Sequence, residues 1–143
     1  MLELVTGEMP SAAKKMLWQK HKLKWRNDTG AALLRDGVCY AWAGLDKVEE
    51  GVYYAHITRD FNNVFSDVPE ERWSEIQDWG TYEIFKWIFG DLGCKKMISD
   101  RRENSTRANE VVARMRNGTW TEDHLEFKAE DMVLNPTAKP NFV

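Results

Sequence analysis

The stretch from Trp79 to Gly93 constrains the fold of this chain more than any other. Its large apolar residues recur three and four positions apart, at Ile84, Phe85, Ile88, Phe89 and Leu92. That spacing predicts an amphipathic helix with a buried stripe. Gly93 is expected to end the helix, because glycine readily adopts the left-handed conformation that follows a last helical turn. A helix with so apolar a face is expected to pack on a sheet.

A strand and a second helix are predicted directly after this helix. The segment 94–99 is short and mostly apolar, as a strand would be. Asn104, Ser105 and Thr106 are residue types that cap helices, and they predict a helix that continues to about Met115.

The first half of the chain reads as strands joined by tight turns. The predicted strands are Leu2–Thr6, Ala31–Arg35, Val38–Ala43 and Val52–Thr58. Asp36-Gly37 is a strong hairpin signal between the second and third of them. Pro10 and Ser11 introduce a helix near the N-terminus. Arg59–Ser66 reads as a loop, and Trp120–Phe127 with Met132–Leu134 as a closing pair of strands. The fold class predicted from this order is α/β or α+β, with helices packed on a sheet.

Length and composition predict one folded domain, residues 1–135, followed by a polar tail, 136–143. Hydrophobic residues make up 43% of the chain, and seven are tryptophan. Twenty basic against 23 acidic residues give a net charge of −3, which argues against a protein that neutralises nucleic acid phosphates over its whole surface. No apolar run is long enough for a membrane span and no signal peptide precedes the domain, so we expect a cytoplasmic protein.

Metal and hydrolase chemistry have no motif in the sequence. Cys39 and Cys94 lack metal-ligand spacing, and we expect them to be reduced core thiols. The acidic group Glu122-Asp123 with His124 and Glu126 does not lie on one face of an alternating strand. We therefore expect no metal site. There is no P-loop, HExxH or CxxC sequence and no Ser-His-Asp order.

Residues 14–26 are the one basic stretch, with Trp18 and Trp25 among the lysines. Basic residues interleaved with aromatics can bind a nucleic acid backbone. The alternative, which we favour, is a solvated helix face whose tryptophans lie in the core.

The order of elements around Gln77-Asp78-Trp79-Gly80-Thr81 resembles the core of the GNAT superfamily of N-acetyltransferases. The similarity covers about Val52 to Leu134: an apolar helix ending in Leu92-Gly93, a strand, Asn104 and another helix. More distantly, the chain is similar to acetyltransferase-like internal virion proteins of short-tailed bacteriophages. The resemblance implies a mixed, mainly antiparallel central sheet flanked by helices. It also implies acetyl-CoA as co-substrate and a small-molecule or protein amine as acceptor.

The same resemblance implies a set of site residues. In the family, a Gln/Arg-x-x-Gly-x-Gly/Ala signature opens the main helix and holds the pyrophosphate of acetyl-CoA on free N–H groups. The corresponding cofactor-binding residues here are Gln77, Gly80, Thr81 and, before the next helix, Asn104. A general base is needed on a neighbouring strand, and His56 is the candidate because its pKa suits the role. Hydrogen-bonded packing is the alternative role of His56.

Two positions depart from the family pattern and open a second hypothesis. Tyr82 stands where the family has Gly or Ala, and Val111 stands where a catalytic Tyr is common. The alternative is a GNAT-fold protein that has lost catalysis and binds another macromolecule, as a virion component or host-directed inhibitor would. The two hypotheses differ at Gly80. A helix that starts there leaves N–H groups for a phosphate. An uninterrupted helix from about Pro69 to Leu92 would use them internally, leave no anion site and end the acetyltransferase interpretation, so that the protein acts by binding.

Overall fold

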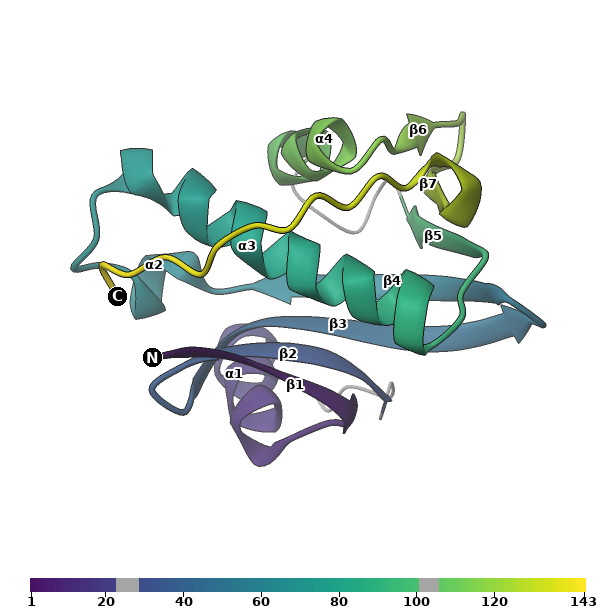
Figure 1. Cartoon of the computed structure of the whole chain (residues 1–143). Coiled ribbons are helices and arrows are strands. Elements are labelled where there is room, and N and C mark those ends of the chain that lie inside the picture. Colours follow the sequence, from purple (N-terminus) through teal and green to yellow (C-terminus); the bar gives the residue numbers. More distant parts are fainter. Residues whose placement is uncertain (23–28, 101–105) are drawn as a thin grey trace.

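A seven-stranded mixed sheet forms the centre of the protein (Figure 1). The computed structural model describes residues 1–22, 29–100 and 106–143. The strand order is β1-β2-β3-β4-β5-β7-β6, and every neighbouring pair is antiparallel except β4 and β5, which are parallel. The strands are β1 (Leu2–Glu8), β2 (Thr29–Arg35), β3 (Val38–Glu49), β4 (Val52–Arg59), β5 (Lys96–Asp100), β6 (Thr119–Trp120) and β7 (His124–Lys128). The predicted fold class, a mainly antiparallel mixed sheet flanked by helices, is confirmed.

Helices cover both faces of this sheet. They are α1 (Ser11–His21), α2 (Phe61–Val64), α3 (Trp73–Lys86) and α4 (Thr106–Met115). Helix α1 packs on one face over a small core that includes Leu34, Cys39 and Trp42. Helices α3 and α4 belong to the other face, whose larger core includes Phe85 and Val112. No helix in the described residues is long and apolar enough to cross a membrane.

The β2–β3 hairpin has the turn that the sequence predicts. Asp36 and Gly37 have φ angles of 49° and 81°, the left-handed values that such a turn requires. The register shifts between Leu33 and Leu34, so that Tyr40 is an extra residue on β3. As a result both Tyr40 and Ala41 contribute to the core under α3.

Helix α3 is continuous through Gly80, and the predicted possibility of a break at this glycine is wrong. A 3₁₀ turn, Glu70–Arg72, leads directly into α3, and a π-helical turn, Trp87–Asp91, continues it. Trp73 and Ile76 extend the apolar stripe toward the N-terminus, and Ile76 is fully buried. Burial of this added stripe favours a longer helix over a start at Gly80.

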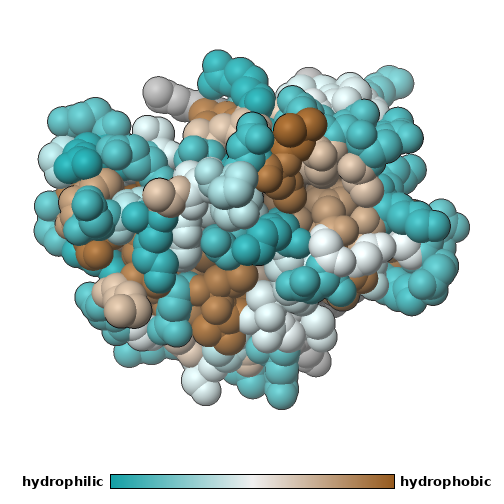
Figure 2. All heavy atoms as spheres, in the orientation of Figure 1, coloured by the Kyte–Doolittle hydropathy of each residue, from teal (hydrophilic) through white to brown (hydrophobic). Residues whose placement is uncertain are grey.

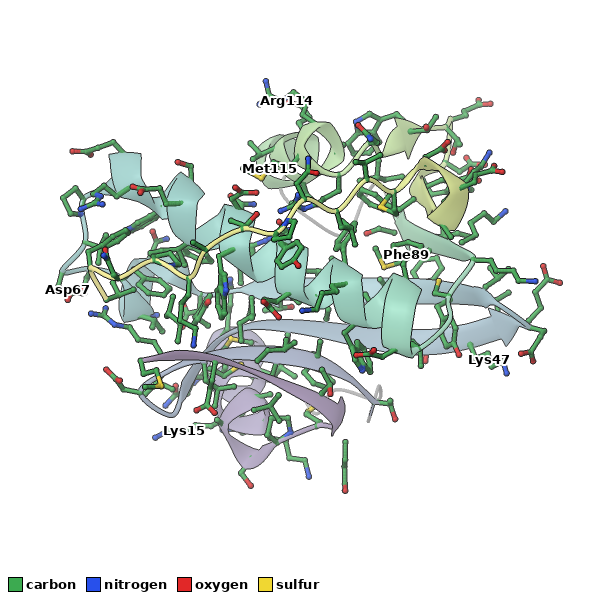
Figure 3. The ribbon with its side chains drawn as sticks, viewed as in Figure 1. Lys15, Lys47, Asp67, Phe89, Arg114 and Met115 are labelled. Atoms are coloured by element: carbon green, nitrogen blue, oxygen red, sulfur yellow. The ribbon has the colours of Figure 1, made fainter. Side chains whose placement is uncertain are left out.

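The predicted core stripe of α3 is confirmed in part. Phe85 and Ile88 are buried, at 2% and 0% exposure, and Phe85 packs edge-on against Phe127 of β7 at a centroid distance of 4.9 Å. Phe89 and Leu92 lie at the rim and pack on the same core while partly exposed. Figure 3 shows Phe89 near the C-terminal end of the helix.

Three other predicted segments differ in the structure. Residues 61–64, inside the expected loop, form the short helix α2. Strand β3 runs to Glu49, past the expected end at Ala43, because it pairs with β4 over its whole second half. The closing strands both lie within residues 119–128, and Met132–Leu134 is not a strand.

The C-terminal segment crosses α3 instead of extending the sheet (Figure 1). Its Lys139 Nζ donates a hydrogen bond to the Leu2 carbonyl oxygen at 2.7 Å and lies over the Trp79 ring. Phe142 stacks under the Arg72 guanidinium, 3.7 Å from its carbon to the ring centroid. The face that α3 and this segment share is mostly hydrophilic, with a few apolar areas (Figure 2).

The aromatic residues of the basic stretch are not both in the core. Trp18 is 58% exposed, so the expectation that it is buried is wrong. Trp25 lies outside the described residues. Cys39 and Cys94 are buried and free, as expected, and burial raises the pKa of Cys39 to about 11.

Candidate functional site

Strands β4 and β5 are paired along only half of β4. Their parallel register runs from Val52 opposite Lys96 to Ala55 opposite Ser99. Beyond Ala55, β4 continues through 56–59 with β3 as its only partner among the described strands. The edge of β4 that faces away from β3 is therefore not used by a described strand over residues 56–59.

Arg59 is the last residue of the part of β4 that pairs with β3 and not with β5. It alternates with Ala55 and Ile57, which contribute to the core under α3, so its side chain starts on that face. Burial lowers the pKa of Arg59 to about 10. No described residue gives it a carboxylate partner, whereas Arg35 and Arg116 each bind one. A desolvated guanidinium with no carboxylate partner among the described residues favours binding of an anion.

Two buried hydroxyls on the same face also lack hydrogen-bond partners. Ser99 Oγ lies at the last β4–β5 pair, where the strands begin to separate, and Ser99 is 2% exposed. Tyr40 Oη lies under α3, next to the β3 position that pairs with Arg59. A buried polar group without a partner costs free energy, so such groups often mark a place where a ligand or water binds.

His56, the predicted base, lies on the opposite face of β4. It is the first residue after the last β4–β5 pair, and it pairs with β3 at Gly44. Its Nε2 is 3.3 Å from Asp46 Oδ2, and its ring packs against Tyr54 at 4.8 Å. The side chain is 13% exposed. The Asp46 carboxylate and the Tyr54 ring therefore hold the imidazole in place on this face.

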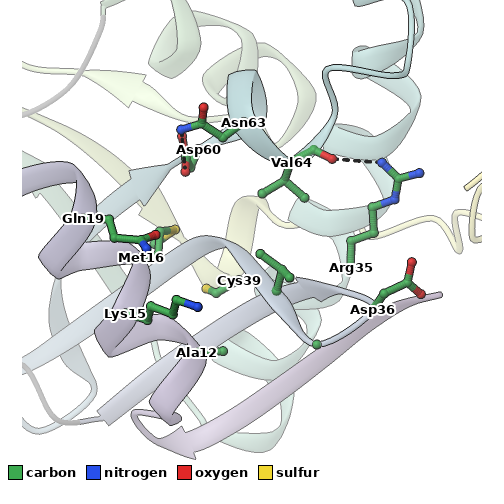
Figure 4. A pocket seen from close by; sticks show the side chains of 12 residues that line it. Ala12, Lys15, Met16, Gln19, Arg35, Asp36, Cys39, Asp60, Asn63 and Val64 are labelled. Atoms are coloured by element: carbon green, nitrogen blue, oxygen red, sulfur yellow. Dashed lines mark hydrogen bonds between the residues drawn. The ribbon is translucent and has the colours of Figure 1, made fainter.

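A recess of about 510 Å³ lies on the α1 face, at the end of β4 (Figure 4). Lys15 and Gln19 of α1, the β2–β3 hairpin and residues 60–64 form its walls. Asp60, which follows β4 directly, accepts hydrogen bonds from Asn63 Nδ2 at 3.0 and 3.2 Å. The recess therefore presents a held carboxylate on the face that also bears His56.

The predicted cofactor residues on α3 do not form an anion site. Gln77, Gly80 and Thr81 lie in the middle of the helix, where their N–H groups are used internally. Thr81 Oγ1 donates a hydrogen bond to the Asp78 carbonyl and accepts one from Arg116 Nε. Asn104 lies outside the described residues, so its predicted role stays a prediction.

Gly80 has a packing role instead of an anion-binding one. A Cβ atom at this position would lie 2.7 Å from Leu33 Cδ1, and Leu33 is buried. The glycine lets α3 approach β2 more closely than any other residue would allow.

We expect Gly80→Ala to lower the free energy of unfolding by about 1 kcal/mol, because a clash of about 1–3 kcal/mol outweighs a gain of about 1 kcal/mol in helix propensity. In a Leu33→Ala background, where the clash is absent, the same substitution should stabilise the protein. Urea unfolding of the four variants measures both signs. A stabilising effect of Gly80→Ala alone would contradict the close approach.

Comparison with solved structures identifies the fold, whereas no family model and no curated protein matches the sequence. The chain is similar to the N-acetyltransferase PseH of Campylobacter jejuni in complex with acetyl coenzyme A: TM-score 0.59, 10% identity, 90% of this chain and 99% of that one covered. It is similar to the ribosomal-protein-S18-alanine N-acetyltransferase of Escherichia coli, with TM-score 0.54, 13% identity and coverage of 90% and 94%. It is also similar to the aminoglycoside acetyltransferase AAC(6')-Ib with coenzyme A and kanamycin, with TM-score 0.57, 11% identity and coverage of 92% and 96%.

The chain has the GNAT fold. At these identities the likeness shows the fold alone. Within this GNAT fold, α3 begins well before Gly80, and the 3₁₀ turn that leads into it carries Glu70 and Glu71. Carboxylates in a first turn are favourable for the helix dipole but repel a phosphate. Val111, on α4, has no hydroxyl that could act as an acid.

Sequence reasoning missed Arg59, Ser99 and Arg116. The sequence places Arg59 at the start of a predicted loop, where charged residues are common, and its lack of a carboxylate partner among the described residues can be seen only in the fold. One available signal was that Arg59 shares the face of Ala55 and Ile57 by alternation. The expectation of no metal site stays a prediction. His124 Nε2 and Glu126 Oε1 are 2.8 Å apart, and the described residues hold no group of three metal-ligating side chains.

Proposed function

We propose that this protein is an N-acyltransferase that uses acetyl-CoA and an amine acceptor, with Arg59 as its anion-binding group. The observation that carries the proposal is the desolvated guanidinium of Arg59, which ends β4 beyond its last pair with β5 and has no carboxylate partner among the described residues. The continuous helix leaves no backbone anion site at Gly80. This excludes binding of a phosphate by backbone N–H groups only. Arg59 offers a side-chain cation in its place.

The residues around the end of β4 fit acetyl-CoA in two respects. Arg59 would hold a phosphate, and Ser99 Oγ would gain the hydrogen-bond partner that it lacks. The bound co-substrate would supply a thioester-activated acetyl group.

His56 is the proposed proton acceptor for the amine. It is the first residue of β4 after the last β4–β5 pair, three residues before Arg59. Asp46 would stabilise the imidazolium that forms when His56 takes the ammonium proton. The Asp60 carboxylate in the recess on the same face would attract a cationic acceptor.

The first test measures the thermal shift with acetyl-CoA in wild type, Arg59→Met and the control Arg114→Met, which changes an exposed arginine on α4. At a hundredfold excess over Kd, the wild type and the control should gain about 2.7 kcal/mol, and Arg59→Met should lose most of that gain. Without ligand, Arg59→Met should be at least as stable as the wild type, because it removes a desolvated charge that has no described partner. No wild-type shift at millimolar acetyl-CoA would overturn the proposal.

The second candidate is a GNAT-fold protein that binds another macromolecule without catalysis. The continuous α3, whose N–H groups at Gly80 are used internally, favours it. The virion or host-directed role implied by the bacteriophage resemblance belongs to this candidate and stays a prediction. Absence of an acetyl-CoA shift would support it over the first.

A further inference from the structure

Trp18 is an exposed tryptophan on a helix whose other apolar residues are buried. Its side chain is 58% exposed, whereas Ala13, Met16 and Leu17 are between 0% and 4% exposed and pack on the sheet. A large aromatic side chain with this exposure contributes little to the core. An exposed indole presents a flat surface on which another ring can stack.

Three lysines surround this indole. Lys14 and Lys15 precede Trp18 by four and three residues, so both neighbour it on the helix surface, and Lys22 follows directly after the helix end. Lys22 ends the helix in a left-handed conformation and donates its N–H to the Trp18 carbonyl. All three are exposed, and in the described part of the chain none forms an ion pair.

The local charge of α1 is opposite to that of the whole protein. Residues 11–21 include three lysines and no acidic residue, while the chain carries a net charge of −3. The clustering favours an anionic partner for this helix. The lysines of α1 can attract an anion locally, although the protein as a whole is negatively charged.

The geometry favours single-stranded nucleic acid over a membrane or an acidic protein. A helix that binds a membrane inserts an apolar face, but the apolar face of α1 is buried on the sheet. An acidic peptide would use the lysines but has no need of the indole. A single strand uses both, since its bases stack on aromatic rings and its phosphates contact lysines.

We propose that the α1 surface formed by Lys14, Lys15, Trp18 and Lys22 binds single-stranded nucleic acid, with a base stacked on Trp18. This site lies on the solvent side of α1. It shares Lys15 with the wall of the recess proposed for the amine acceptor, but acetyl-CoA plays no part in it.

The test titrates the full chain into a fluorescein-labelled oligothymidine and follows anisotropy together with quenching of tryptophan fluorescence. We expect saturable binding. The logarithm of the association constant should fall with the logarithm of the salt concentration at a slope of about −2, as for three phosphate contacts on a single strand. Trp18→Ala should weaken binding by about fivefold or more. Lys14→Glu should weaken it and reduce the slope.

Val48→Ala is the matched control, because Val48 is 59% exposed on the distant end of β3. Its affinity should equal that of the wild type. Trp18 is exposed, so Trp18→Ala should keep the wild-type Tm, which shows that any loss of binding is local. Lack of wild-type binding at low salt would overturn the proposal. Equal affinity of Trp18→Ala, or equal competition by polyglutamate, would also overturn it.

Discussion

Phe85→Ala should lower the free energy of unfolding by about 3–5 kcal/mol, the usual cost of a large-to-small change in a packed core. Phe85 is 2% exposed and lies where α3 meets β7. Its ring packs edge-on against Phe127 and near Phe89, with centroid distances of 4.9 and 5.9 Å. Removing the ring leaves a cavity between a helix and a sheet that other contacts hold in place, so the site cannot collapse fully. Urea or thermal unfolding measures the loss.

Phe89→Ala is the matched comparison on the same helix. Phe89 is partly exposed and contributes at the rim of the same core, so its loss should be clearly smaller. Equal losses for the two variants would mean that the periodic stripe does not define the inner face of α3. A loss under about 1 kcal/mol for Phe85→Ala would mean that its ring faces solvent or a partner.

The sequence predicts the regular elements well where local signals agree with burial. Asp36-Gly37 has the conformational freedom that its turn requires, and the alternating strands on either side pair as expected. The stripe containing Phe85 and Ile88 has a helical period, and the structure buries both residues. Periodicity and turn chemistry act over a few residues, which is why they can be read without the fold.

The role of Gly80 cannot be predicted from its neighbours in the sequence. A glycine within a helical pattern is compatible with a helix start, an interruption or a close contact with another element. Here the deciding partner is Leu33, which is 47 residues away in the sequence and 2.7 Å from where a Cβ would lie. The resemblance to the family favoured an anion site, but the contact with β2 explains the glycine without one.

Trp18 and Arg59 show the same limit for the functional surfaces. Composition favours a buried tryptophan, and only the placement of α1 on the sheet shows which side of that helix meets solvent. The sequence predicts that Arg59 begins a loop, whereas in the structure it ends β4, beyond the last β4–β5 pair. The role of His56 as a base stays a prediction.

Arg116 links α4 to α3 by a set of hydrogen bonds that no sequence pattern indicates. It is 7% exposed. Its Nη2 donates to both the carbonyl and Oδ1 of Asp78, each at 2.7 Å, and its Nε donates to Thr81 Oγ1 at 3.2 Å. The Asp78 side chain is 42% exposed, so water can solvate that carboxylate when the arginine is removed.

Arg116→Met should lower the free energy of unfolding by about 2–3 kcal/mol. Breaking a fully buried ion pair costs about 3–5 kcal/mol, and the exposure of Asp78 reduces that figure. Met keeps most of the aliphatic volume, so the loss reports the hydrogen bonds and not a cavity. Asp78→Asn, which keeps the backbone acceptor and an amide oxygen, should cost less than about 1 kcal/mol.

The double variant separates the two contributions. If the guanidinium acts through the Asp78 carboxylate, the losses of unfolding free energy in Arg116→Met and Asp78→Asn will sum to more than the loss in the double variant. The reason is that both substitutions remove the same ion pair. Strict additivity would mean that Arg116 stabilises the protein through the backbone carbonyl and Thr81 alone. A loss below about 0.5 kcal/mol for Arg116→Met would contradict a structural link between α4 and the middle of α3.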